Sequence, residues 1–190
     1  MPFYHKLLHR FTVQELILIS AMAALGIAVK PIVVALVHLI SAPLLIPGGA
    51  LAGGLYMMWL VVAMGLTGKR GAATLVGLIQ AILVTLTGIS GSHGVMSLVS
   101  YTAPGIAVDL GLLLIRHRVC CLPCAFFAGV LANVTGTVIV NIIFFSLPPL
   151  PLLLSLAAAA FSGGVGGILS WQLLKTLQKY QIGGRKYEQR

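Results

Sequence analysis

The chain has 190 residues, of which 59% are hydrophobic and only 8% are charged, and its mean hydropathy is +1.07. Soluble domains carry about 25% charged residues, so this composition excludes both a water-soluble globular domain and a disordered chain. At about 20 residues per membrane-spanning helix, the length allows roughly six spans and leaves no room for a separate soluble catalytic domain. We therefore predict an all-α integral membrane protein with a single transmembrane domain.

The predicted spans follow the apolar runs in chain order. The first covers residues 12–30 and stops before Pro31, because proline breaks or kinks a helix. The apolar segment 31–46 contains another proline, and we interpret it as a continuation of the first helix or as a short re-entrant piece that connects it to the second. The remaining helices are expected at residues 47–66, 71–87, 95–115, 122–145 and 150–177.

The positions of the basic residues test this division of the chain into six spans. The sequence has twelve Lys and Arg and only three Asp and Glu. On a soluble protein this excess would suggest a nucleic-acid partner, which we do not expect here, because the positions of the charges report membrane orientation instead. With six spans, every basic residue except Lys30 lies on one face of the membrane. Positive residues favour the cytoplasm, so we predict a plasma-membrane protein with both termini inside. The residues on that face are Lys6, Arg10, Lys69, Arg70, Arg116, Arg118, Lys175, Lys179, Arg185, Lys186 and Arg190.

Charge within a span is costly and often functional, so Lys30 and Asp109 are considered in turn. Lys30, at the outer end of the first helix, either contacts an anionic group of a ligand or extends its ammonium to the lipid headgroups. Asp109 lies nearer the cytoplasmic end of the fourth helix, and we favour a structural role for it, with Asn133 or a backbone N–H as its partner.

Aromatic and polar residues gather in the outer halves of the predicted spans. Any one of them is more often an interfacial aromatic or an interhelical hydrogen bond, but together they predict a small-molecule pocket. We expect Trp59 and Tyr101 to form stacking walls, and Lys30 to pair with a carboxylate or phosphate of the ligand. The expected polar anchors are Gln80, His93 and Asn141, and the wider set includes Tyr56, Thr87, Ser97 and Thr137.

The first predicted helix carries Ser20, Ala24 and Ala28 at four-residue spacing. Small residues at this spacing let a second helix approach closely, either within the bundle or from a separate membrane subunit.

Three cysteines and a histidine lie close together at the inner end of the fifth predicted helix, in the sequence HRVCCLPC. His117, Cys120, Cys121 and Cys124 could in principle bind a metal. Because the cytoplasm keeps thiols reduced and Pro123 interrupts the group, we expect no metal site but unliganded or acylated thiols.

Motifs of catalysis and nucleotide binding do not occur in the sequence. There is no G-x-x-x-x-G-K-[ST], no H-E-x-x-H and no G-x-S-x-G, and the spans hold no pair of carboxylates for acid–base catalysis. We therefore expect neither an enzyme nor a resident cofactor. The energy for transport must come from another chain or from an ion gradient. In the second case the chain is a stand-alone secondary transporter or a small channel, with Asp109 as the candidate coupling residue.

Six spans, about 190 residues and the Ala24-x-x-x-Ala28 pattern resemble the S components of energy-coupling factor (ECF) transporters, the substrate-binding subunits of vitamin importers. Residues 53–88 and the following YTAPGIAVDL look most like the YkoE-type S components, a group linked to thiamine and its hydroxymethylpyrimidine precursor. The resemblance implies a transmembrane T component and two cytoplasmic ATPases that use ATP. It also implies that Ala24 and Ala28 dock on the T component, and that residues 31–48 cap a substrate near the outer surface.

Overall fold

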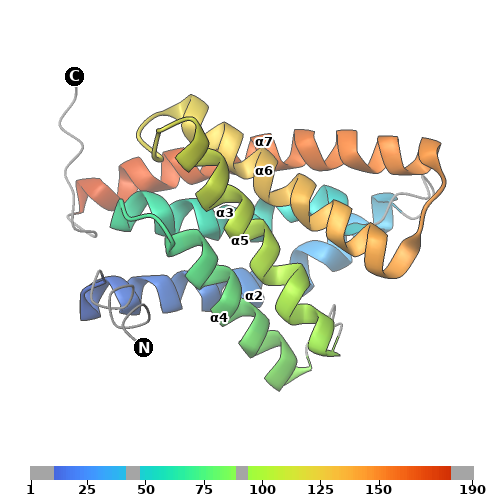
Figure 1. Cartoon of the computed structure of the whole chain (residues 1–190), viewed down its shortest axis with the longest axis horizontal. Helices are drawn as coiled ribbons and strands as arrows, with labels where there is room; N and C mark the ends of the chain where they lie inside the picture. Colours follow the sequence, from blue (N-terminus) through green and yellow to red (C-terminus); the bar gives the residue numbers. More distant parts are fainter. Residues whose placement is uncertain (1–10, 42–47, 89–93, 181–190) are drawn as a thin grey trace.

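The computed structural model describes residues 11–41, 48–88 and 94–180, and within these ranges the chain is all-helical (Figure 1). The six α-helices are α2 (Val13–Ser41), α3 (Gly48–Thr67), α4 (Ala72–Thr87), α5 (Ser97–Leu114), α6 (Leu122–Val140) and α7 (Pro149–Lys179). A 3₁₀ turn, η2 (Gly94–Met96), precedes α5, and a π-helical turn, η3 (Asn141–Phe145), ends α6.

Helix α3 forms the centre of the bundle, because its apolar sequence is rich in glycine and alanine and other helices can approach it closely. It packs on α2, α4, α6 and α7. Its contact with α7 is nearly backbone to backbone: a Cβ on Gly166 would fall on the carbonyl of Gly54. The glycines of α7 therefore serve packing within the bundle.

The first helix is longer than predicted. Helix α2 continues through Pro31 to Ser41, so the expected end at Lys30 is wrong and the continuation is the correct interpretation of residues 31–41. Proline removes one hydrogen bond from a helix, but a membrane helix surrounded by neighbours tolerates this loss. Residues 42–46 of the predicted connection lie outside the described residues.

The six predicted helices are all present among the described residues, but they differ in length. Five are long and apolar enough to cross a membrane. Helix α4 has 16 residues, about 24 Å at 1.5 Å per residue, which is shorter than a hydrocarbon core of about 30 Å.

The basic loops lie together at one end of the bundle, where α2 begins and α7 ends (Figure 1). Lys69, in the loop between α3 and α4, forms an ion pair of 2.6 Å with Glu15 at the start of α2. Arg118, between α5 and α6, donates a hydrogen bond of 2.6 Å to the carbonyl of Gly68. These contacts join three of the four predicted cytoplasmic segments. Lys6, Arg10, Arg185, Lys186 and Arg190 lie outside the described residues.

Asp109 has the structural role that we favoured. Its carboxylate accepts hydrogen bonds from the backbone N–H groups of Gly71 and Thr74, both at 2.8 Å, and from the Thr74 hydroxyl at 2.6 Å. It therefore caps the N-terminus of α4 from the neighbouring helix α5, where the helix dipole also favours a negative charge. Asn133 is not its partner, since that amide donates to the carbonyls of Ala50 and Ala159, both at 2.9 Å.

Candidate functional site

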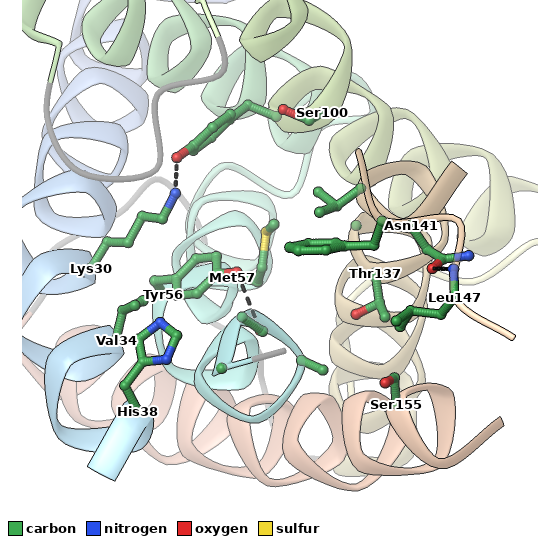
Figure 2. A pocket seen from close by; sticks show the side chains of 17 residues that line it. Lys30, Val34, His38, Tyr56, Met57, Ser100, Thr137, Asn141, Leu147 and Ser155 are labelled. Carbon is green, nitrogen blue, oxygen red and sulfur yellow. Dashed lines mark hydrogen bonds between the residues drawn. The ribbon is translucent and has the colours of Figure 1, made fainter. Parts of the chain in front are cut away.

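A cavity of about 320 Å³ lies at the end of the bundle opposite the basic loops, between the second half of α2 and the ends of α3, α5, α6 and α7 that lie away from those loops. Figure 2 shows the side chains that line it. Five helices contribute to its walls: α2, α3, α5, α6 and α7. Most of the lining is apolar, with a few polar side chains, which is the usual composition of a small-molecule site. The lining residues are Lys30, Val34, His38, Gly48, Gly49, Ala50, Tyr56, Met57, Ser100, Tyr101, Gly136, Thr137, Val140, Asn141, Phe145, Leu147 and Ser155.

Lys30 brings a cation into this cavity. The side chain is only 9% exposed, and its ammonium donates a hydrogen bond to the Tyr101 hydroxyl (Figure 2). The same Nζ lies 4.5 Å from the centre of the Tyr101 ring and 5.5 Å from that of Tyr56, within the range of cation–π attraction. Of the two interpretations of Lys30, the structure therefore favours the one in which the ammonium faces a pocket rather than the headgroups.

The hydroxyl and amide groups of the lining differ in how far they are already engaged. The Asn141 Oδ1 accepts a hydrogen bond of 3.0 Å from the backbone N–H of Leu147. Asn141 therefore stabilises the turn that leads into α7. The Tyr56 hydroxyl donates to the carbonyl of Gly49 at 3.3 Å. The Ser100 Oγ, by contrast, is buried and has no hydrogen-bond partner within the described part of the chain. A buried hydroxyl without a partner costs free energy, so a ligand that bonded to it would remove that penalty.

Three of the six residues predicted to bind a ligand, Lys30, Tyr101 and Asn141, line the cavity. Trp59 and Gln80 do not line the cavity, and both side chains lie close to Gly26 of α2. The Gln80 amide reaches the carbonyl of Ala23 at 3.5 Å. Both large side chains fill the space that this glycine leaves. They therefore hold α2 against α3 and α4 in the structure. The sixth residue, His93, lies outside the described residues.

The sequence analysis did not select His38, Met57 or Ser100, although all three line the cavity. His38 was missed because the first helix was expected to end at Lys30. Lys30, Val34 and His38 are four residues apart, so they share one face of a helix that continues through Pro31. This spacing was the signal that could have identified them.

The Ser20, Ala24 and Ala28 face of α2 does not pack within the bundle. All three residues are exposed, whereas Gly26 of the same helix is buried against its neighbours. Of the two interpretations of this spacing, packing inside the bundle is therefore not what the structure shows.

Two comparisons with known proteins agree with this architecture. The model of a family described as the permease component of ABC-type cobalt transport systems matches residues 14–135. The chain belongs to this family. The matched region includes Lys30, Tyr56 and Tyr101 and ends before Asn141, so it covers the part of the permease that surrounds the buried ammonium.

A solved structure described as an S-component of an ECF transporter superposes on this permease with a TM-score of 0.77. The two chains are 20% identical, and the match covers 90% of this chain and 88% of the other. The fold is thus the ECF S-component fold, and both comparisons are with transport proteins rather than with enzymes. No curated protein matches the sequence.

Proposed function

We propose that the chain is the substrate-binding subunit of an ECF-type importer and captures a small organic nutrient in the cavity around Lys30. The observation that carries this proposal is a buried ammonium in a preformed cavity, at the opposite end of the bundle from the basic loops. If those loops face the cytoplasm, as positive charges favour, the cavity lies on the outer side of the plasma membrane, where an importer receives its substrate. Both termini are then cytoplasmic.

The chemistry of the lining narrows the substrate class. The ammonium of Lys30 repels a cation, so the thiazolium of thiamine is a poor match. A flat pyrimidine such as hydroxymethylpyrimidine fits better, because its ring nitrogens and hydroxyl accept hydrogen bonds and its faces can stack near the Tyr56 and Tyr101 rings. A bare cobalt ion fits poorly, since the described lining offers one imidazole, that of His38, and neither carboxylate nor thiolate.

Ligand binding to the purified protein tests this function. Native mass spectrometry of the detergent-solubilised protein would detect a co-purified molecule, and titration would then compare hydroxymethylpyrimidine with thiamine. We expect Lys30→Met to weaken binding by about 10- to 100-fold, since a hydrogen bond to a charged group contributes about 1.5–3 kcal/mol. Ser100→Ala and Tyr101→Phe should weaken it less.

Lys175→Met is the matched control, because this lysine is exposed at the opposite end of the bundle. Its variant should bind as the wild type does. Unchanged affinity in all three cavity variants would overturn the assignment of the cavity as the binding site.

We further propose that the Ser20, Ala24 and Ala28 face docks on a T component that couples to two ATPases. These residues are exposed and small, so a partner helix can approach the α2 backbone. Ala24→Leu should reduce uptake by the whole complex while leaving ligand affinity unchanged. Uptake in membranes that lack any ATPase partner would instead favour a stand-alone secondary transporter.

A further inference from the structure

His117, Cys120, Cys121 and Cys124 lie together in the turn between α5 and α6 and in the first turn of α6. This cluster stands at the basic end of the bundle. Along α6, Cys124 precedes the first cavity residue, Gly136, by twelve positions, or about 18 Å at 1.5 Å per residue. The cluster is therefore separate from the substrate cavity, and nothing in the proposed transport function uses it.

The distances between the donor atoms match those of a metal site. In a tetrahedral zinc site, with Zn–S of about 2.3 Å and Zn–N of about 2.0–2.1 Å, two sulfurs lie about 3.8 Å apart and a sulfur and a nitrogen about 3.6 Å. The Cys120 and Cys124 sulfurs are 3.9 Å apart, and the His117 Nδ1 lies 3.9 Å from the first and 3.6 Å from the second. These three atoms already form one face of such a tetrahedron.

Cys121 offers a fourth sulfur beside these three atoms, although only the other three donor atoms lie within 4.8 Å of one another. Its Sγ is 3.9 Å from that of Cys120 and 3.0 Å from that of Cys124. The second distance is shorter than a tetrahedral edge, but it is well beyond the S–S bond of about 2.05 Å, so the two thiols are not joined. To complete the tetrahedron, the Cys121 side chain would have to change its rotamer and move its sulfur away from that of Cys124.

The backbone of the α5–α6 turn brings the four donor side chains close together. Arg116 adopts a left-handed conformation with φ of 55°, which reverses the chain after α5. Arg118 donates a hydrogen bond to the carbonyl of Gly68. Cys121 occupies the N-cap position of α6, and a proline follows it in the first turn of that helix. The positive end of a helix favours thiolates, which are the form of cysteine that binds metals.

We propose that this turn binds one Zn²⁺ ion through His117 Nδ1 and the thiolates of Cys120, Cys121 and Cys124. Binding is a simple ligand exchange: the three thiols release their protons to solvent, and no oxidation occurs. The ion would lock the α5–α6 turn beside the α3–α4 loop. The sequence alone favours free thiols, but in the structure three of the four donor atoms lie within 4.8 Å of one another, as a shared metal ion requires.

The test uses the full chain without a histidine tag, reduced with a thiol-free reductant, stripped with a chelator and titrated with Co²⁺ and then Zn²⁺. We expect one equivalent of Co²⁺ to give the thiolate-to-metal charge-transfer bands and visible absorption of a tetrahedral site, and one equivalent of Zn²⁺ to abolish them. Cys120→Ser and His117→Gln, both at exposed positions, should each weaken metal affinity at least tenfold.

His38→Gln is the control, because it removes an imidazole from the cavity and leaves the cluster intact. Its titration should match that of the wild type. Retention of the substrate affinity by Cys120→Ser would show that this variant is folded. The proposal is overturned if the wild type binds no Co²⁺ at micromolar concentration, or if Cys120→Ser and His117→Gln give the wild-type spectrum and affinity.

Discussion

The role of Asp109 gives the sharpest test of how the bundle is held together at its basic end. Its carboxylate is only 9% exposed and accepts three hydrogen bonds from the first turn of α4. Asp109→Ala removes all three and leaves two backbone N–H groups unpaired. At about 1–3 kcal/mol for each unpaired buried group, we expect the free energy of unfolding to fall by about 3–5 kcal/mol.

Two milder variants separate the contributions of shape and charge. Asp109→Asn keeps an oxygen acceptor but loses the charge that favours a helix N-terminus, which should destabilise the protein by about 1–2 kcal/mol. Thr74→Val removes only the 2.6 Å hydroxyl bond and should destabilise it by about 1 kcal/mol. Thr85→Val is the matched control, because that hydroxyl donates only to the carbonyl of Ala81 in its own helix.

Thermal unfolding in detergent, followed by size-exclusion chromatography of heated samples, would rank these variants. We expect the midpoint to fall most for Asp109→Ala, less for Asp109→Asn, and least for Thr74→Val. Ligand affinity measured well below the midpoint should stay unchanged, because Asp109 is at the far end of the bundle from the cavity. The structural interpretation would be refuted if Asp109→Asn kept the wild-type midpoint but abolished uptake. That result would point to Asp109 as an ion-coupling residue of a secondary transporter.

Three further substitutions test the packing among α3, α6 and α7. Gly166→Ala should destabilise the protein by at least 2 kcal/mol, or prevent its folding, since the new Cβ would overlap the carbonyl of Gly54, and backbone cannot move aside easily. Gly164→Ala, which meets only the ring of the half-exposed Phe126, should cost much less in the same thermal assay. Asn133→Ala should lower the unfolding free energy by about 1–3 kcal/mol, because it removes two buried hydrogen bonds, to the carbonyls of Ala50 and Ala159, of about 0.5–1.5 kcal/mol each. A midpoint equal to that of the wild type would contradict this.

The sequence was enough to predict the helices and the end of the bundle at which the basic loops meet. Both can be read along the sequence: the length of an apolar run indicates a membrane span, and the positions of the basic loops indicate which side of the membrane they occupy. The predicted end of the first helix at Lys30 was wrong, because a proline usually ends a helix but α2, packed against neighbouring helices, continues through Pro31. That one error removed Val34 and His38 from the expected site.

The sequence could not show which way each side chain faces. A helix in lipid has no polar outer face to fix its rotation, so Trp59 of α3 was as plausible a pocket wall as Tyr56 of the same helix. Contacts between helices decide the matter: Trp59 packs beside Gly26, while Tyr56 borders the cavity.

The same kind of evidence separates the two buried charges, which look alike in the sequence. Asp109 has three donors directed at its two oxygens, so its hydrogen-bonding capacity is largely used by the fold. Lys30 carries three N–H donors, and in the described structure one of them meets the Tyr101 hydroxyl while two aromatic rings flank the ammonium. A buried ammonium with few protein acceptors costs free energy. In the function that we propose, an entering ligand with acceptor atoms supplies the missing hydrogen bonds.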